Sequence, residues 1–261
     1  MCDQKSPIAL CILPAQHRNP GFAGITLGTG TSIFSNFAAL DLTAMPSLAR
    51  GGARAHRAPL IVTTATRFRD YGRIVSDFAR ETVTIVTWPQ PGWRPVVAGT
   101  GNEGGVVEDS FAMERRGEVQ HAVNRAVGRS YVTGWFTDPA IASEHRPPTD
   151  TSRIYTHEAN YHPDGGQIFW PRDGAAYVAL LARPGDDVRP EDFVAFYCDG
   201  SFGIHINPGV WHQPVFPIAP AAVFDDKQGR VHACIAVNFV SEFGCYLEVP
   251  LVPSDGALAA I

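Results

Sequence analysis

The chain has 261 residues, of which 45% are hydrophobic and 18% charged, and it carries a formal net charge of -5. This is enough apolar material for one domain of barrel size, while the lack of a basic stripe excludes an electrostatic case for binding nucleic acid. The five cysteines form no C-x-x-C pair and no apolar run of about 18 residues occurs, so the sequence predicts a cytoplasmic protein without a disulfide framework, a thiolate zinc site or a membrane span.

Residues 1–58 differ from the rest of the chain in their sequence pattern. They contain scattered glycines and no sustained hydrophobic period, which predicts a weakly ordered N-terminal extension. Several Ser, Thr and Arg residues and few acids leave a transit peptide open, and with it a location in an organelle. Residues 59–252 are expected to form the folded domain, and residues 253–261 a C-terminal tail.

From residue 59 onward the pattern is typical of short β-strands separated by Gly and Pro turns. A helix, or a helix followed by a strand, is expected over 66–80, and a short helix over 190–197. Strands are expected at 60–64, 82–88, 130–136, 154–161, 175–181, 204–206, 210–211, 232–239 and 245–249. The pattern predicts an all-β domain, either a β-sandwich or a closed barrel, with one or two short helices and space inside for one small ligand.

The first polar stretch lies at the end of the strand expected over 154–161. Because side chains alternate along a strand, Glu158, Asn160 and His162 share one face. A Pro- and Gly-containing turn follows, and Gln167 then starts the next strand, so His162 and Gln167 are expected to point inward from facing strands. An imidazole together with an oxygen donor is a common ligand set for a divalent metal.

The second polar stretch surrounds a predicted tight turn at Pro208-Gly209. His205 and Asn207 lie on one strand face before this turn, and His212 lies after it. His212 is therefore a further candidate imidazole for the same interior.

These two stretches resemble the two sequence boxes of the cupin superfamily. Asn160-x-His162, Gln167 and Gly174 match the spacing of the first box, and Pro208-Gly209-x-x-His212 matches the second. The resemblance implies a cupin-like double-stranded β-helix, or jelly-roll barrel. It also implies a divalent metal ion (Ni, Mn, Zn or Fe) held by His162, Gln167 and His212.

The chain departs from the cupin pattern at one position. Asn160 stands where the first His of the usual His-x-His pair is found. Either Glu158 or His205 is a candidate to replace that ligand.

A closer resemblance is to the ureidoglycolate lyase family, which has a cupin-like barrel. It is carried by the motif over 162–171, by Pro-Gly-Asp-Asp at 184–187, by the segment 203–214 and by Phe-x-x-Tyr-Gly at 68–72. Together these pieces extend over roughly residues 60–252. Two positions differ from family members: Asn207 stands in place of a second His, and Gln213 in place of a His that often follows His212.

The resemblance implies a homodimeric enzyme of purine catabolism that splits ureidoglycolate into glyoxylate and urea during allantoin degradation. Ureidoglycolate is a carbinolamide, and its C–N bond breaks when the hydroxyl loses a proton and the urea nitrogen gains one. A metal or an imidazole near the hydroxyl would promote that loss, and a second imidazole would act as the acid. Two alternatives stay open: another metal-dependent cupin enzyme (an isomerase or dioxygenase), and a non-catalytic cupin that binds a small ligand.

The resemblance and the strand pattern together assign the candidate roles. The residues expected to act in catalysis are His162, His205, His212 and Glu158. The residues expected to bind the small-molecule substrate are Gln167, Asn160, Arg172, Trp211 and Asn207. The cation for the substrate carboxylate is not fixed, because Arg125 and Arg153 compete with Arg172 for that role.

Overall fold

The computed structural model describes residues 45–86, 92–97, 100, 103–231 and 233–253, all within a compact unit that spans residues 41–261. Most of the predicted N-terminal extension and the tail from residue 254 onward lie outside the described residues. The last part of the extension forms a strand that pairs with the domain, and the division of the chain at residue 58 stays a prediction.

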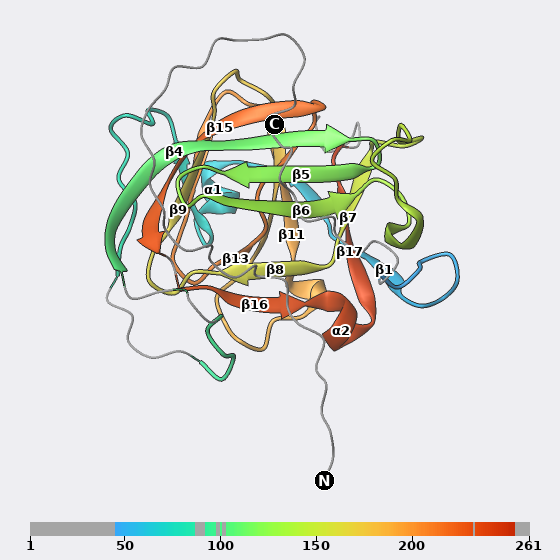
Figure 1. The fold of residues 1–261 in the computed structure, drawn as a ribbon. Coiled ribbons are helices and arrows are strands. Elements are labelled where there is room, and N and C mark those ends of the chain that lie inside the picture. The colour runs from blue at the N-terminus through green and yellow to red at the C-terminus, as the bar shows by residue number, and fades with distance from the viewer. Residues whose placement is uncertain (1–44, 87–91, 98–99, 101–102, 232, 254–261) are drawn as a thin grey trace, which may run out of the picture. The chain divides into compact units, whose positions relative to one another are not determined.

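Two β-sheets make up this unit (Figure 1). The ten-stranded sheet has the order β1 (Arg54–Arg57), β17 (Cys245–Pro250), β7 (Arg153–Thr156), β6 (Arg129–Trp135), β5 (Val119–Asn124), β4 (Glu103–Arg116), β15 (Ala221–Val231), β9 (Gln167–Pro171), β12 (Gly203–Ile206) and β3 (Gly72–Val75). The seven-stranded sheet has the order β16 (Ile235–Asn238), β8 (Glu158–Tyr161), β13 (Trp211–His212), β10 (Tyr177–Ala182), β11 (Val194–Cys198) and β2 (Leu60–Val62), and β14 (Phe216–Pro217) pairs with β10.

Helix is scarce. The structure has two short α-helices, α1 (Ala65–Phe68) and α2 (Phe239–Phe243), and two single 3₁₀ turns, η2 (Pro139–Ile141) and η3 (Pro190–Asp192). The predicted all-β, cupin-like class with one or two short helices is therefore confirmed. No helix among the described residues is long and apolar enough to cross a membrane.

Predicted elements differ from the structure in type at 190–197 and in extent at 82–88. The helix expected over 190–197 is wrong: one 3₁₀ turn at η3 leads directly into strand β11. The strand expected over 82–88 is reduced, in its described part, to an isolated bridge between Ile85 and Gly165. Of the two readings of 66–80, the structure has the helix followed by a strand, α1 and then β3.

The strand expected over 154–161 is interrupted at His157. Its first half, β7, belongs to the ten-stranded sheet, and its second half, β8, belongs to the seven-stranded sheet. The alternation of side chains still holds within β8, which is the part that precedes the first candidate imidazole.

Strands β4, β5 and β15 were not expected from the sequence. The residues of β4 and β15 include several Asp, Glu and Gly, which are depleted in strands and obscure the alternation. These strands form because they pair with one another over long antiparallel stretches, so that cross-strand packing overrides local preference.

The two largest hydrophobic clusters of the described residues lie one on each face of strand β10 in the seven-stranded sheet. The inner core lies between the two sheets and combines side chains of β10 and β11 with side chains of β4, β9, β12 and β15. The outer core covers the other face of β10 with side chains of β7, β8, β16 and β17. Alternate residues of β10 therefore belong to different cores: Tyr177, Ala179 and Leu181 to the inner core, and Val178, Leu180 and Ala182 to the outer core.

Burial of β10 on both faces leads to a stability prediction. Leu180 is completely buried, so Leu180→Ala is expected to lower the free energy of unfolding by about 2–5 kcal/mol through lost burial and the cavity left behind. Ile141, which is half exposed, provides the matched control, and Ile141→Ala is expected to change stability little. Chemical denaturation of the full chain measures both, and equal losses would contradict the two-sided core.

Candidate functional site

Two predicted imidazoles lie side by side at one edge of the inner core. His162 follows strand β8, and His212 ends β13, which pairs with β8. Their ring centroids are 5.1 Å apart, with the ring planes at 62°. Two residues 50 positions apart in the chain thus form one imidazole pair, as the spacing of the two boxes predicts.

The backbone fixes the orientation of both rings. Nδ1 of His162 lies 2.9 Å from the carbonyl oxygen of Ala233, and Nδ1 of His212 lies 2.8 Å from that of Val210. A carbonyl oxygen only accepts, so each Nδ1 carries the hydrogen, and in the neutral ring the lone pair is on Nε2. Burial, and then the neighbouring His162, lower the pKa of His212 to about 3, which keeps this ring neutral at physiological pH.

Asn160 belongs to the same group. It is the residue directly opposite His212 in the pairing of β8 with β13, so their side chains share a face. Its Oδ1 is buried and has no hydrogen-bond partner. The structure therefore brings together three of the predicted residues: Asn160, His162 and His212.

Gln167 faces the same inner core from the opposite sheet. His212 lies opposite the inner-core residue Leu181 in the pairing of β13 with β10, so these two side chains share a face. Gln167 lies two residues before the inner-core residue Phe169 on β9, so its side chain also points toward the inner core. The side chain of Gln167 is engaged, because its Nε2 donates to Oδ1 of Asp226 at 2.8 Å.

Asp226 belongs to a row of polar residues that the sequence did not reveal. Asn124 of β5, Gln167 of β9, and Asp226 and Gln228 of β15 are all buried, and together we call them the polar wall. Gln228 pairs with Gln167, and Asp226 pairs with the inner-core residue Phe169, which places both side chains on the inner face. Alternation from the apolar Phe224 would have revealed Asp226, had β15 been recognised as a strand.

The buried position of Asp226 disfavours its charge. Burial raises the pKa of this carboxyl to about 8, the hydrogen bond from Gln167 works against that shift, and nearby Asp109 reinforces it. Oδ2 of Asp226 has no hydrogen-bond partner.

His205 is not part of the imidazole pair. Its neighbours Ile204 and Ile206 point into the inner core, so His205 points to the other face of β12. There its Nδ1 lies 3.1 Å from Nη1 of Arg73, and its Nε2 accepts from the backbone N–H of Thr84 at 3.1 Å. Burial and Arg73 lower the pKa of His205 to about 4. The structure thus places His205 apart from the imidazole pair and beside Arg73 and Thr84, and its expected catalytic role stays a prediction.

Three other candidates have polar partners outside the imidazole pair. The side chain of Asn207 interacts with His205. Arg172 is half exposed and forms an ion pair with Asp225 at the surface. The carboxylate of Glu158 lies 3.5 Å from Nε2 of His157.

Trp211 was expected to contact the substrate but points into the outer core, because it alternates with His212 on β13. Its indole Nε1 donates to the carbonyl oxygen of Gly185 at 2.8 Å, and its ring meets Tyr161 edge to face at 4.6 Å. Tyr161 in turn donates to Oδ1 of Asp186 at 2.6 Å. Tyr161 and Trp211, which directly precede the two imidazoles in the chain, are thus both hydrogen-bonded to the loop at 185–186.

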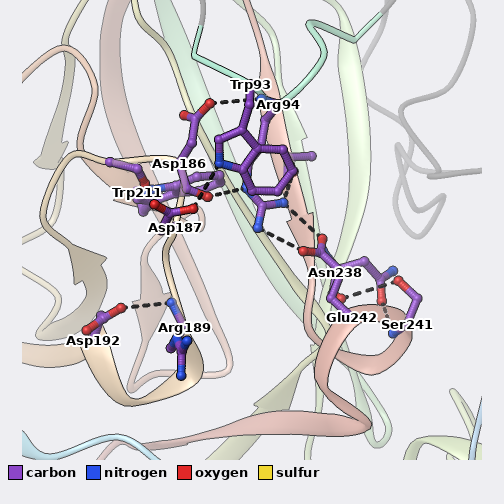
Figure 2. A network of polar contacts seen from close by, with 12 residues as sticks. Trp93, Arg94, Asp186, Asp187, Arg189, Asp192, Trp211, Asn238, Ser241 and Glu242 are labelled. Atoms are coloured by element: carbon purple, nitrogen blue, oxygen red, sulfur yellow. Dashed lines mark hydrogen bonds and ion pairs between the residues drawn. The ribbon is translucent and has the colours of Figure 1, made fainter.

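Arg94 joins this network around the loop and Trp211, as Figure 2 shows. Its guanidinium binds both carboxylate oxygens of Glu242, at 3.0 and 2.8 Å, and lies 5.5 Å from the ring centroid of Trp211. Its backbone N–H and its Nε donate to Asp186. Arg94 is nearly fully buried whereas Glu242 is partly exposed, so this bidentate ion pair reaches from the interior to the surface.

A pocket of about 480 Å³ lies next to this loop. It is lined by Tyr71, Arg183, Pro184, Gly185, Asp186, Asp187, Val188 and Asp192. Neither imidazole is among these residues.

The imidazole pair fits two positions in the coordination shell of a divalent metal. Hydrogen-bonding of Nδ1 to a carbonyl is the usual way a metal-binding His presents Nε2. Within the described part of the chain, no group of three or more His, Cys, Asp and Glu side chains could hold a metal. A third protein ligand would therefore have to be an amide oxygen, such as that of the predicted ligand Gln167.

The raised pKa of Asp226 predicts a pH effect on stability. Between about pH 4 and pH 8 the unfolded chain releases this proton while the folded protein keeps it, so the contribution of Asp226 to stability falls as pH rises. Asp226→Asn removes this titration, so the variant should gain stability relative to the parent as pH rises through that window. Thermal unfolding of both proteins at pH 5 and pH 8.5 measures the difference, and a pH-independent difference would contradict it.

Comparison with known proteins agrees with this geometry. The family model for ureidoglycolate lyase matches residues 59–241. A ureidoglycolate lyase of Azotobacter vinelandii is 39% identical over 67 residues, which are 26% of this chain and 37% of that protein. One of Salmonella enteritidis PT4 is 33% identical over 79 residues, 30% of this chain and 49% of that protein.

The chain thus spans less than half the length of these curated relatives, whereas the family model covers most of the chain. This chain belongs to the ureidoglycolate lyase family, whose fold is cupin-like.

Proposed function

We propose that this protein is a carbon–nitrogen lyase that cleaves ureidoglycolate, or a related small carbinolamide acid, to glyoxylate and urea. The observation that carries the proposal is the imidazole pair at the edge of the inner core, in which His212 is buried, His162 is partly buried, and both Nδ1 atoms are held by carbonyl oxygens. The family match supports the same reaction and gives no support to an isomerase, a dioxygenase or a non-catalytic cupin.

The reaction needs one proton to move from oxygen to nitrogen. The carbinol hydroxyl loses its proton, the C–O bond becomes the carbonyl of glyoxylate, and the electron pair of the C–N bond passes to nitrogen, which takes up a proton to give urea. In the proposal, one Nε2 accepts the hydroxyl proton, and the resulting imidazolium or its neighbour supplies the proton to the leaving nitrogen. No net proton is gained or lost, so two adjacent neutral imidazoles suffice.

Asn160 is proposed to orient the substrate in this arrangement. Its unpartnered Oδ1 lies on the same face as His212 and offers a hydrogen-bond acceptor to a hydroxyl or N–H group. Because the amide is buried, such a bond would be shielded from water and would position the carbinol carbon firmly.

A divalent metal, where bound, would be held by Nε2 of His162 and of His212, with Gln167 as a further ligand. It would supply Lewis-acid polarisation of the hydroxyl oxygen. The imidazoles then act as ligands and orient the substrate oxygen, and Asn160 keeps its role toward the hydroxyl or N–H group.

The remaining expectations stay predictions. A homodimer, a cytoplasmic location and a small acid as substrate rest on the family resemblance and on the composition.

The lyase proposal predicts the effect of removing either imidazole. His162→Ala and His212→Ala are each expected to lower kcat/KM for ureidoglycolate by about 10²–10⁴-fold, the usual contribution of a positioned acid or base. The assay is glyoxylate release by the purified full chain. His145→Ala is the matched control, because His145 is exposed and should leave turnover unchanged. Unchanged turnover in both site variants, with folding intact, would overturn the proposal.

Metal analysis tests the ligand assignment separately. If the imidazole pair holds a divalent ion, the purified protein contains Ni, Mn, Zn or Fe at about one ion per chain, and His212→Ala lowers that content. Elemental analysis after dialysis measures it, together with activity before and after chelation. A metal-free protein with full activity would show that the imidazoles act without an ion.

A further inference from the structure

The polar wall contains three buried atoms with no hydrogen-bond partner. These are Oδ1 of Asn124, Oδ2 of Asp226 and Nε2 of Gln228. The three residues are exposed by only 3%, 0% and 4%. Polar atoms this deeply buried are nearly always paired in folded proteins, so three in one patch point to a group that joins them.

The three atoms lie on one face and on contiguous strands. Asp226 and Gln228 are two residues apart on β15, about 7 Å along the strand. Gln167 connects them, because it pairs with Gln228 and donates to Asp226. Asn124 joins from β5, where its side chain also hydrogen-bonds to Asp226. One ligand of a few heavy atoms can therefore reach all three.

The wall also has a route to solvent. Asp109 on β4 is paired with Asp226, and the two side chains lie on the same face of the sheet. The side chain of Asp109 is exposed. Phe111, two residues further along the same strand, is buried in the inner core. The polar wall is thus the inner end of a surface that opens at Asp109, and a small ligand can approach from that end.

The chemistry of the wall selects a neutral group that both donates and accepts hydrogen bonds. The amide nitrogen of Gln228 needs an acceptor, and the amide oxygen of Asn124 needs a donor. Oδ2 of Asp226 accepts when the carboxyl is ionised and donates when it is protonated. The nearby carboxylate of Asp109 disfavours an anion, so the carboxylate end of a substrate would lie elsewhere.

We propose that the polar wall is the subsite for the ureido group of the substrate. The carbonyl of this group accepts from Gln228, and its N–H groups face Asn124 and Asp226. The wall and the imidazole pair face the same inner core, so a ureido group held here would direct the carbinol carbon toward His162 and His212. The assignment deepens the proposed lyase function, on which the choice of substrate rests.

Binding without turnover tests this subsite. N-carbamoylglycine has the ureido group and carboxylate of the substrate but lacks the hydroxyl, so its C–N bond cannot break by the same route. N-acetylglycine differs from it in one group, a methyl in place of the terminal NH₂. We expect the full chain to bind N-carbamoylglycine about tenfold or more tightly in isothermal titration, since the unpaired buried atoms reject the methyl.

Variants of Asn124 should remove that preference, because Asn124 accepts from the terminal NH₂ that N-acetylglycine lacks. Asn124→Leu is expected to weaken N-carbamoylglycine about tenfold while changing N-acetylglycine little, and Asn124→Ala tests the same loss of the acceptor if the leucine variant folds poorly. Gln228→Leu removes the donor to the carbonyl that both probes share, so it is expected to weaken both of them. Asp225→Asn is the matched control, because Asp225 is adjacent on β15 but its side chain pairs with Arg172 at the surface.

The outcomes separate this inference from the lyase proposal. Equal affinity for the two probes, or an unchanged preference in folded Asn124→Leu and Asn124→Ala, would overturn the ureido subsite even if the parent protein releases glyoxylate. A preference that disappears in the Asn124 variants supports the subsite even if ureidoglycolate is not cleaved. Equal loss for both probes in the Asn124 variants would show general damage to the site and would also count against the subsite.

Discussion

The site depends on one constraint: the central strands of the seven-stranded sheet are buried on both faces. Strands β10 and β11 send alternate side chains into the inner and the outer core, so a shift of one residue would exchange the two sets. In β8 and β13 that shift would replace His162 and His212 by Tyr161 and Trp211. Two apolar cores therefore fix the register that places two polar rings together, at an energetic cost that the packing on both sides offsets.

The far side of the same sheet provides the matching support. Tyr161 and Trp211 pack edge to face in the outer core, and both are hydrogen-bonded to the loop at 185–186. Arg94 binds that loop and Glu242 from behind (Figure 2). The positions of the imidazoles are thus set by contacts on the face opposite to the one that they present.

The sequence predicted the part of the site that depends on local spacing. The boxes around His162 and His212 place both residues next to tight turns, and those turns bring β8 and β13 together as expected. The chain passes from the ten-stranded sheet to the seven-stranded sheet at the turn between β12 and β13. The alternation of side chains along β12 therefore does not predict which face of β13 a residue occupies, and His205 was grouped with His212 although it points to the other face of β12. Asp226 was missed for another reason. Strand β15, which carries it, forms through long-range pairing with β4 and β9, and its Asp- and Gly-containing sequence is not typical of a strand.

The buried Arg94 network also affects how related sequences should be compared. Arg94 contacts Asp186, Glu242 and Trp211, none of which faces the inner core that both imidazoles border. An exchange at one of these four positions would tilt the histidine rings while leaving every group on the substrate side unaltered. Across the family such positions should vary in concert with one another and independently of substrate preference.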